Sequence, residues 1–165
     1  MTETYAKAFG LGATIGMRAL AGPALLSRKL VRTTPVNEPQ RPVDYFIQQP
    51  VATALEVLAA AEILTDKLPG VPNRTVPVQF VGRMVSGGSC GAVLSEAEGQ
   101  SVLAGSLAGG VGAVAGTLVT FQLRQWLTHT AGLPDFVVAL AEDVLCVGAG
   151  WAIVNSIEPA RQRAY

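Results

Sequence analysis

The sequence predicts an all-α protein, a polytopic membrane bundle of about five transmembrane helices in a single domain over residues 1–165. Composition is the first reason: 15% of residues are charged, against roughly 25% in soluble domains, and 50% are hydrophobic, with a mean hydropathy of +0.39. The second is length, because apolar stretches near the ~20 residues that a bilayer crossing requires recur along the chain. A soluble Ala/Gly-rich helical protein is the alternative, but no charged residue occurs from Ser101 to Gln122.

Polar and turn-forming residues separate the first two predicted helices. The first helix is expected from about residue 5 to residue 26, with Gly22-Pro23 disturbing its last turn. A stretch rich in Thr, Pro, Asn and Gln follows over residues 33–49, which predicts a surface loop. The second helix covers about residues 50–68, and the Pro69-Gly70 run ends it.

Three further helices are expected over about residues 76–95, 101–126 and 134–157. Five crossings would place the chain termini on opposite sides of the membrane. Lys and Arg residues are more numerous in the segments on the C-terminal side, which favours a cytoplasmic C-terminus.

Glycines spaced four residues apart mark three of these helices. Small residues at this spacing lie on one helix face and allow close contact between helices in lipid, where no hydrophobic force drives helices together. The Gly10-to-Gly16 run differs from a dinucleotide-binding fingerprint, because its last gap is one residue longer and no strand precedes it. The pairs with this spacing are Gly12 with Gly16, Gly87 with Gly91, and Gly112 with Gly116.

The glycine pattern also suggests a duplication. Gly10-Leu-Gly12-Ala-Thr-Ile-Gly16 in the first helix matches Gly110-Val-Gly112-Ala-Val-Ala-Gly116 in the fourth, and the helix after each carries an acidic pair. One helix separates the halves, so helices 1–2 and 4–5 would form an inverted repeat of the kind found in many transporters. Chance similarity between Gly/Ala-rich helices is the alternative.

Two acidic pairs, Glu62 with Asp66 and Glu142 with Asp143, lie inside the second and fifth predicted helices. Carboxylates at membrane depth are costly, so each pair is a candidate functional site. Glu62 and Asp66 share one helix face, where they would bind a hard cation or carry a proton. Glu142 and Asp143 are adjacent and diverge by about 100° around the helix. The predicted site is an acidic cavity between these two helices, and no metal is assigned to it.

Arginines supply the counter-charges in this prediction. Arg18 and Arg83 lie within the first and third helices and need acidic partners or water. The deep carboxylates outnumber them, which favours a cation or proton site over structural pairing alone. The acidic residues counted here are Glu56, Glu62, Asp66, Glu142 and Asp143.

Several function classes find no support in the sequence. The net charge is zero and the basic residues are scattered, so no nucleic-acid footprint is expected. No nucleophile lies beside a base, so we expect no enzyme and no cofactor. Cys90 and Cys146 fall in apolar helices without a neighbouring Cys-x-x-Cys or Cys/His cluster, and His129 falls in a loop.

Several short motifs together resemble an uncharacterised, domain-of-unknown-function family of small Gly-rich bacterial integral membrane proteins. The resemblance covers nearly the whole chain and implies an integral membrane protein, without an activity. The motifs that carry it are Gly16-Met-Arg18, Glu62-Ile-Leu-Thr-Asp66-Lys67-Leu-Pro69, Pro72-Asn-Arg74, Gly82-Arg83 and Glu142-Asp143.

A more distant likeness is to cation/proton exchangers with repeated Glu-x-Gly-Asp-Lys-Thr motifs in inverted halves. Here the Glu62-to-Lys67 run is one residue longer and lacks the glycine and the final threonine, and the second half has no lysine after Glu142-Asp143. Metal specificity is therefore not transferred by this analogy.

These observations predict a multi-pass protein of the bacterial inner membrane that transports a small cation or a proton-coupled solute. The lipid bilayer and further copies of the chain, in a homo-oligomer, are the expected partners. The alternative is a non-transporting structural or accessory subunit whose ion pairs hold its helices together.

Overall fold

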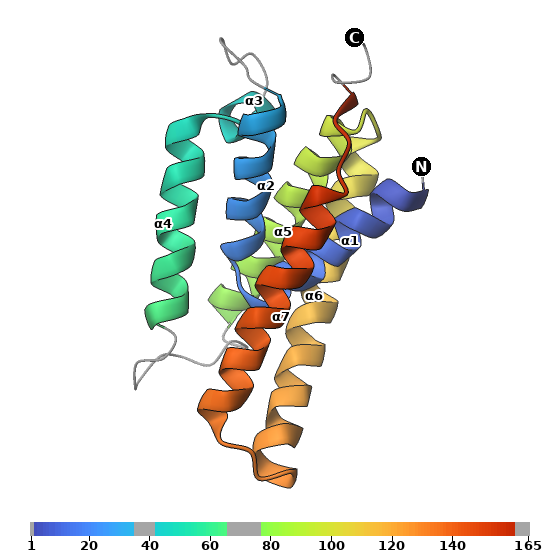
Figure 1. Cartoon of the computed structure of the whole chain (residues 1–165). Coiled ribbons are helices and arrows are strands. Elements are labelled where there is room, and N and C mark those ends of the chain that lie inside the picture. The colour runs from blue at the N-terminus through green and yellow to red at the C-terminus, as the bar shows by residue number, and fades with distance from the viewer. Residues whose placement is uncertain (1, 35–41, 66–76, 161–165) are drawn as a thin grey trace.

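The computed structural model describes residues 2–34, 42–65 and 77–160, and all regular structure in these ranges is helical (Figure 1). The all-α prediction is therefore confirmed. The elements in chain order are α1 (Thr2–Met17), α2 (Ala21–Thr33), α3 (Pro42–Phe46), α4 (Gln49–Thr65), α5 (Pro77–Ala97), α6 (Val102–Gln125), the π-helical turn η1 (Trp126–Thr130) and α7 (Asp135–Asn155).

The last four predicted helices match α4, α5, α6 and α7 to within a few residues, although the predicted end of the second lies outside the described residues. The expected surface loop over residues 33–49 contains the short helix α3. Two helical segments, Val102–Thr130 and Asp135–Asn155, are long and apolar enough to cross a membrane. The count of five crossings stays a prediction.

The first predicted helix is wrong as a single element, because the chain breaks between Met17 and Ala21. Pro23 explains the break: it has no N–H to donate to the carbonyl of Ala19, and its ring would clash with that carbonyl in a continuous helix. Proline is tolerated in a first helical turn, and Pro23 is the third residue of α2. The sequence over residues 2–33 therefore forms two helices that turn back on each other (Figure 1).

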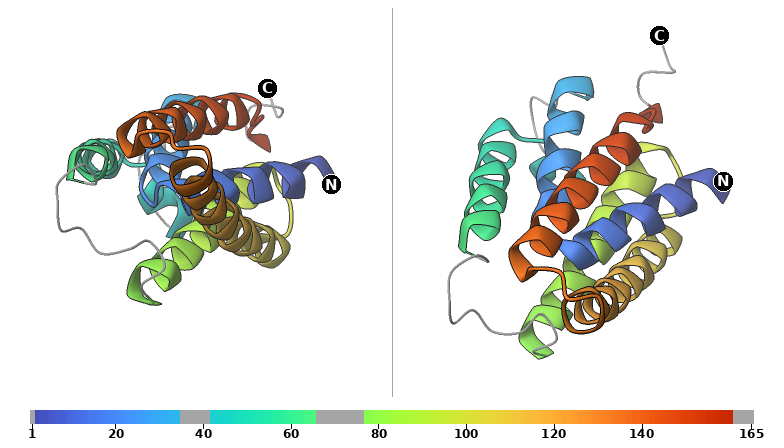
Figure 2. Two further views of the ribbon diagram at one scale, coloured as in Figure 1. Left: turned by 90° about the horizontal axis from the view of Figure 1, so that it is seen from below. Right: turned by 60° about the horizontal axis from the view of Figure 1, so that its bottom comes forward.

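The tip of this α1–α2 hairpin lies at mid-height in the bundle. Near its start, α1 contacts the turn between α5 and α6, where the Thr4 hydroxyl donates to Glu98 at 2.7 Å. At its end, Gly16 lies against residues 113–117, in the middle of α6. Figure 2 shows α1 running alongside α6 and α5 and ending well inside the bundle.

Glycine contacts hold α6 between α1 and α5. A Cβ atom added at Gly109 would overlap the carbonyl oxygen of Gly87 on α5, and one at Gly116 would overlap the backbone of Ala13 on α1. These backbones approach so closely only because side chains are absent at the contact. The predicted packing role of the paired glycines is thus seen at atomic detail.

The inverted repeat is not confirmed. The two matched glycine runs lie on α1 and α6, and these helices run parallel: Gly12 packs on Gly109, whereas Gly16 packs further along α6, near Ala113 and Thr117. Corresponding helices of an inverted repeat would run in opposite directions. The similarity therefore reflects two helices that use the same small residues to pack on each other.

Both described ends of the chain lie at one end of the bundle, contrary to the expected opposite placement (Figure 1). The Lys7 ammonium donates to the Ser156 carbonyl at 2.9 Å and to Glu98 at 3.1 Å, and the Glu158 N–H donates to Glu98 at 3.3 Å. Glu98 therefore joins the start of α1, the α5–α6 turn and the end of α7. The expectation of a cytoplasmic C-terminus assumed that the termini lie on opposite sides, and this placement does not support it.

Large apolar side chains cover the outer faces of α6 and α7, and small residues line the contacts between α1, α5 and α6, beside an apolar core cluster that includes Leu11, Leu26 and Leu94. Leu103 on α6 is 71% exposed and Val144 on α7 is 68% exposed, whereas Gly105 and Gly109 are buried. In water, an exposed apolar surface of this extent marks an interaction surface.

Glycine substitutions should separate buried helix contacts from open positions. We expect Gly109→Ala to lower stability by about 1–3 kcal/mol, because the new methyl group must push α5 and α6 apart. Gly148 on α7 has nothing within 4 Å of an added Cβ, so Gly148→Ala is the matched control and should not destabilise. Thermal unfolding of both variants in detergent, followed by circular dichroism, measures the difference; equal midpoints would contradict this packing.

Glu98 should make stability depend on pH. Burial raises the pKa of Glu98, but hydrogen bonds from Thr4, Lys7 and the Glu158 N–H, together with the Lys7 charge, outweigh burial and lower it below the usual 4.5. A carboxyl group with a lowered folded-state pKa stabilises the fold above its unfolded pKa and loses that contribution as pH falls through the folded value. We therefore expect the unfolding midpoint to fall below about pH 4.5, and to fall less in Glu98→Gln. An identical acid dependence in the variant would contradict the assignment.

Candidate functional site

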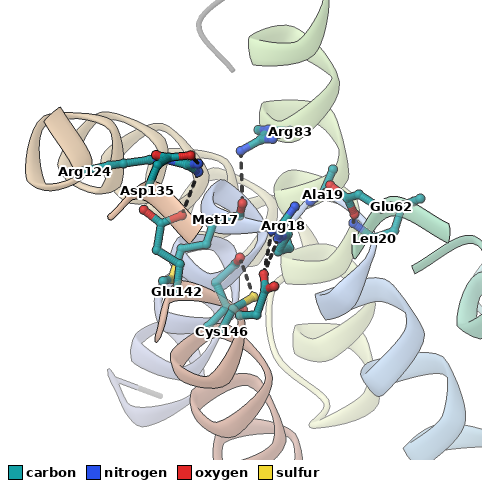
Figure 3. A network of polar contacts seen from close by, with 12 residues as sticks. Met17, Arg18, Ala19, Leu20, Glu62, Arg83, Arg124, Asp135, Glu142 and Cys146 are labelled. Carbon is teal, nitrogen blue, oxygen red and sulfur yellow. Dashed lines mark hydrogen bonds and ion pairs between the residues drawn. The ribbon is translucent and has the colours of Figure 1, made fainter. Parts of the chain in front are cut away.

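The candidate site is the break itself, residues Arg18, Ala19 and Leu20, where the chain leaves α1 and enters α2 (Figure 3). A helix end leaves backbone carbonyls or N–H groups without partners inside the helix, and a buried end needs them supplied from elsewhere. Side chains from α4, α5 and α6 supply them here, and α7 binds the arginine at the first position of the break.

Arg83 caps the carboxyl end of α1. Its Nη1 atom donates to the Gly16 carbonyl at 2.6 Å and to the Met17 carbonyl at 3.3 Å, and the Thr117 hydroxyl donates to Gly16 at 3.2 Å. The guanidinium is buried, with 5% of the residue exposed. A cation at a helix carboxyl end is favourable because the free carbonyls carry partial negative charge. The predicted counter-charge role of Arg83 is therefore directed at backbone carbonyls.

Glu62 caps the opposite side of the break. Its Oε1 accepts from the Ala19 N–H and its Oε2 from the Leu20 N–H, both at 2.9 Å. Figure 3 shows Glu62 reaching these two residues from α4. Both carboxylate oxygens are used at the amino end of α2, where the backbone carries partial positive charge.

Arg18 and Asp143 form a buried ion pair. Arg18 Nε and Nη2 lie 2.7 and 2.6 Å from Asp143 Oδ1, and the two side chains are 2% and 9% exposed. Such a pair compensates two buried charges and depends on both partners being present. Beside it, the Cys146 thiol donates to the Thr14 carbonyl at 3.3 Å, so Cys146 also contributes to the α1–α7 contact.

Glu142 points to a different part of the bundle. Its Oε2 lies 3.4 Å from Arg124 Nη1, and the same arginine binds Asp135 at 2.7 and 2.9 Å across the α6–α7 connection. Adjacent residues on a helix diverge by about 100°, and Glu142 and Asp143 accordingly meet different arginines.

The common acidic cavity stays a prediction, because within the described ranges only Glu62 and Asp143 reach the break and they bind different groups there. Glu62 and Asp143 approach the break from α4 and α7, with α2 packed between those helices, and Glu142 lies elsewhere. Asp66 lies outside the described residues. No group of three or more His, Cys, Asp and Glu side chains in the described ranges is placed to hold a metal ion.

Two contributions to the site were missed from the sequence. The Ser86 hydroxyl on α5 donates a hydrogen bond to the Ala19 carbonyl at 3.0 Å. In a continuous helix the N–H of residue 23 would bind this carbonyl, but Pro23 has no N–H. Thr117 caps Gly16 from α6. Gly22-Pro23 was the available signal: a proline in an apolar helix leaves a carbonyl one turn earlier that another group must satisfy.

Chemically, the break combines a carboxylate that can take up a proton with the two backbone donors that hold it. An ionised carboxylate accepts both N–H bonds, whereas a protonated one keeps a single good acceptor, because its hydroxyl is a donor. The contact between α4 and the break is therefore sensitive to the protonation of Glu62.

Removing Asp143 should be far more damaging than removing Glu142. Asp143→Ala takes away the carboxylate that compensates Arg18, at an expected cost of about 3–5 kcal/mol. In Glu142→Ala, Arg124 is partly exposed and keeps Asp135, so we expect a loss below about 1 kcal/mol. Unfolding in detergent with increasing denaturant compares the two; similar losses would contradict the distinction between these neighbours.

Known proteins that resemble this chain identify its family but not an activity. No curated protein and no solved structure matches the chain. A family model described as a domain of unknown function (DUF4126) matches residues 6–156. This match covers the α1–α2 break and every charged contact described around it. The chain thus belongs to the DUF4126 family, as its resemblance to a domain-of-unknown-function family predicted.

Proposed function

We propose that the protein is a multi-pass protein of the bacterial inner membrane that transports a small cation or a proton-coupled solute. The break between α1 and α2 is its site, and Glu62 is the carboxylate that takes up and releases a proton or cation. The observation that carries the proposal is the bidentate contact of Glu62 with the Ala19 and Leu20 N–H groups at the end of a discontinuous helix.

The surface and the helix lengths support the membrane setting. At 1.5 Å per residue, α5, α6 and α7 are about 31–36 Å long, enough for a hydrocarbon core of ~30 Å. By the same measure α1 and α2 reach only about 24 and 20 Å. In this setting they form a re-entrant hairpin that enters and leaves on one side. Non-helical backbone at such a depth is tolerated only where protein or a cavity surrounds it.

Broken helices support the transport part of the proposal. Many secondary transporters bind substrates and coupling ions where discontinuous helices expose backbone groups near the bilayer midplane. Here Gly16 lies against the middle of α6, Arg18 meets the middle of α7, and Arg83 comes from the first half of α5. If α5, α6 and α7 cross the membrane, the break lies near the bilayer midplane, where such sites occur.

Glu62 differs from the other described candidates in the contacts that its oxygens make. Asp143 and Glu142 lie against arginines. Both oxygens of Glu62 accept backbone N–H groups, and its side chain is only partly buried. Asp66 follows one helical turn later in the sequence and would extend the same acidic face.

A structural or accessory role is the second candidate, and the contacts of the arginines favour it. Arg18 pairs with Asp143, and Arg83 caps two carbonyls of α1. These contacts explain buried charge without a transported ligand. On this alternative, Glu62 also serves only to cap α2, and the expected homo-oligomer or a larger complex would be the functional unit.

Flux measurements separate the two candidates. In proteoliposomes, we expect Glu62→Gln to abolish ion-driven or proton-driven flux while the protein still elutes as a folded species, because glutamine cannot exchange a proton. Glu56→Gln is the matched control on the same helix. The Glu56 carboxylate lies 3.3 Å from the Arg28 guanidinium, and both side chains are half-exposed. A wild-type protein that moves neither protons nor Na⁺, K⁺, Mg²⁺, Ca²⁺ or Mn²⁺ would remove the transport proposal and favour the accessory role.

A further inference from the structure

Both described ends of the chain lie at one end of the bundle, together with the end of α2, α3 and the α5–α6 turn (Figure 1). Residues from these parts of the chain, among them Thr34, Val43, Ala97 and Ala160, line one small cavity there. We call this end of the bundle the terminal face. The end of α4, the start of α5 and the α6–α7 connection form the opposite face. The helices α4 to α7 therefore run between the two faces.

Lysines and arginines are concentrated at the terminal face. Among the described residues, Lys7 lies there on α1, and Arg28, Lys29 and Arg32 lie on the last two turns of α2, whereas Arg124 lies at the opposite face. The sequence between α2 and α3 and the sequence after residue 160 contain three more arginines, and the sequence between α4 and α5 contains one lysine and one arginine. The segments that adjoin the terminal face thus hold seven of the twelve basic residues, and those that adjoin the opposite face hold three.

Two of these cations have no carboxylate partner within the described part of the chain. Lys7 and Arg28 each lie within 3.3 Å of a glutamate oxygen. Lys29 and Arg32 make no such pair there. Arg32 is exposed and Lys29 is half-buried, so their charges are available to a partner outside the chain.

The length of α2 places these two cations at the membrane surface. In the proposed membrane setting, α2 begins at Ala21, beside a break near the bilayer midplane. Arg32 is eleven residues further along α2, about 16.5 Å at 1.5 Å per residue, and half of a hydrocarbon core of ~30 Å is about 15 Å. Lys29 lies about 12 Å along the helix, and its flexible stem allows the ammonium to reach the same level. Both charges are therefore at the depth of the lipid phosphates.

Exposed aromatic side chains mark both faces. Tyr45 of α3 and Trp151 near the end of α7 belong to the terminal face, and Trp126 after α6 belongs to the opposite face. Tyrosine and tryptophan are enriched where the hydrocarbon core meets water, because their rings are apolar and carry one polar group. The aromatic side chains thus support the same two membrane surfaces as the depth of the α2 cations.

We propose that the terminal face lies at the cytoplasmic surface of the membrane, where Lys29 and Arg32 bind the phosphate groups of anionic lipids. Loops rich in lysine and arginine stay on the cytoplasmic side, and anionic lipids attract basic residues near the membrane surface. Both chain termini are then cytoplasmic, and the α1–α2 hairpin enters and leaves the membrane from that side. This inference rests on the proposed membrane setting, but it depends neither on Glu62 nor on transport.

Thiol labelling from one side of the membrane tests the orientation. Thr2→Cys and Ala160→Cys place thiols at exposed positions of the terminal face, and Ala131→Cys is the matched variant at the opposite face. Cys90 and Cys146 are buried and are kept. In spheroplasts, a membrane-impermeant maleimide should label Ala131→Cys alone. In inside-out vesicles, it should label Thr2→Cys and Ala160→Cys alone.

The outcomes of this labelling separate the orientation from the proposed function. Labelling of Thr2→Cys or Ala160→Cys in spheroplasts overturns the orientation and leaves the membrane setting and transport standing. A chain recovered in the soluble fraction overturns the membrane setting, and both proposals with it.

A charge-removing variant tests the lipid contact. In nanodiscs with equal amounts of phosphatidylglycerol and phosphatidylcholine, native mass spectrometry measures which lipids stay bound to the released protein. We expect Lys29→Gln/Arg32→Gln to retain on the order of tenfold less phosphatidylglycerol than the parent, because each basic residue near the surface adds to the attraction. Lys29→Arg/Arg32→Lys keeps both charges and should retain as much as the parent. Equal retention by the glutamine variant and the parent overturns the contact.

Discussion

Pro23 imposes the constraint on which the rest of the structure depends. It forbids a continuous helix through residues 17–21, so a short piece of backbone with unpaired carbonyls and N–H groups lies deep inside the bundle. Each such group is expensive unless another part of the protein binds it. Arg83 and Ser86 of α5 bind carbonyls of this segment, and Glu62 of α4 binds two of its N–H groups.

Close helix packing makes these contacts possible. Arg83 and Thr117 reach the end of α1 because glycines bring α1, α5 and α6 within backbone contact of one another. An interior filled with Leu and Phe would keep these backbones several ångströms further apart. The glycine contacts and the charged contacts are therefore parts of one arrangement: close approach fixes the helices, and the charged side chains fix the end of the hairpin between them.

The sequence predicted the helices well where the length of an apolar stretch decides them. We could predict α5, α6 and α7 from these lengths, and the close helix packing from the spacing of the glycines, without knowing the fold. The direction of α1 relative to α6 could not be predicted, because it depends on a reversal at Arg18–Leu20 that the apolar pattern conceals. The sequence singled out several charged residues that lie around the break, but it could not predict that their contacts include backbone groups. Glu62, Arg18, Arg83 and Asp143 do meet, but around backbone groups that no side-chain count includes.

The α1–α2 hairpin has a consequence for the order in which the chain can reach its final form. Arg18 leaves the ribosome 125 residues before Asp143, its partner, and Arg83 also follows the carbonyls that it caps. During synthesis the tip of the hairpin therefore has none of the groups that later make its burial tolerable. The tip of the hairpin cannot have all of its buried contacts until α5 and α7 have been made.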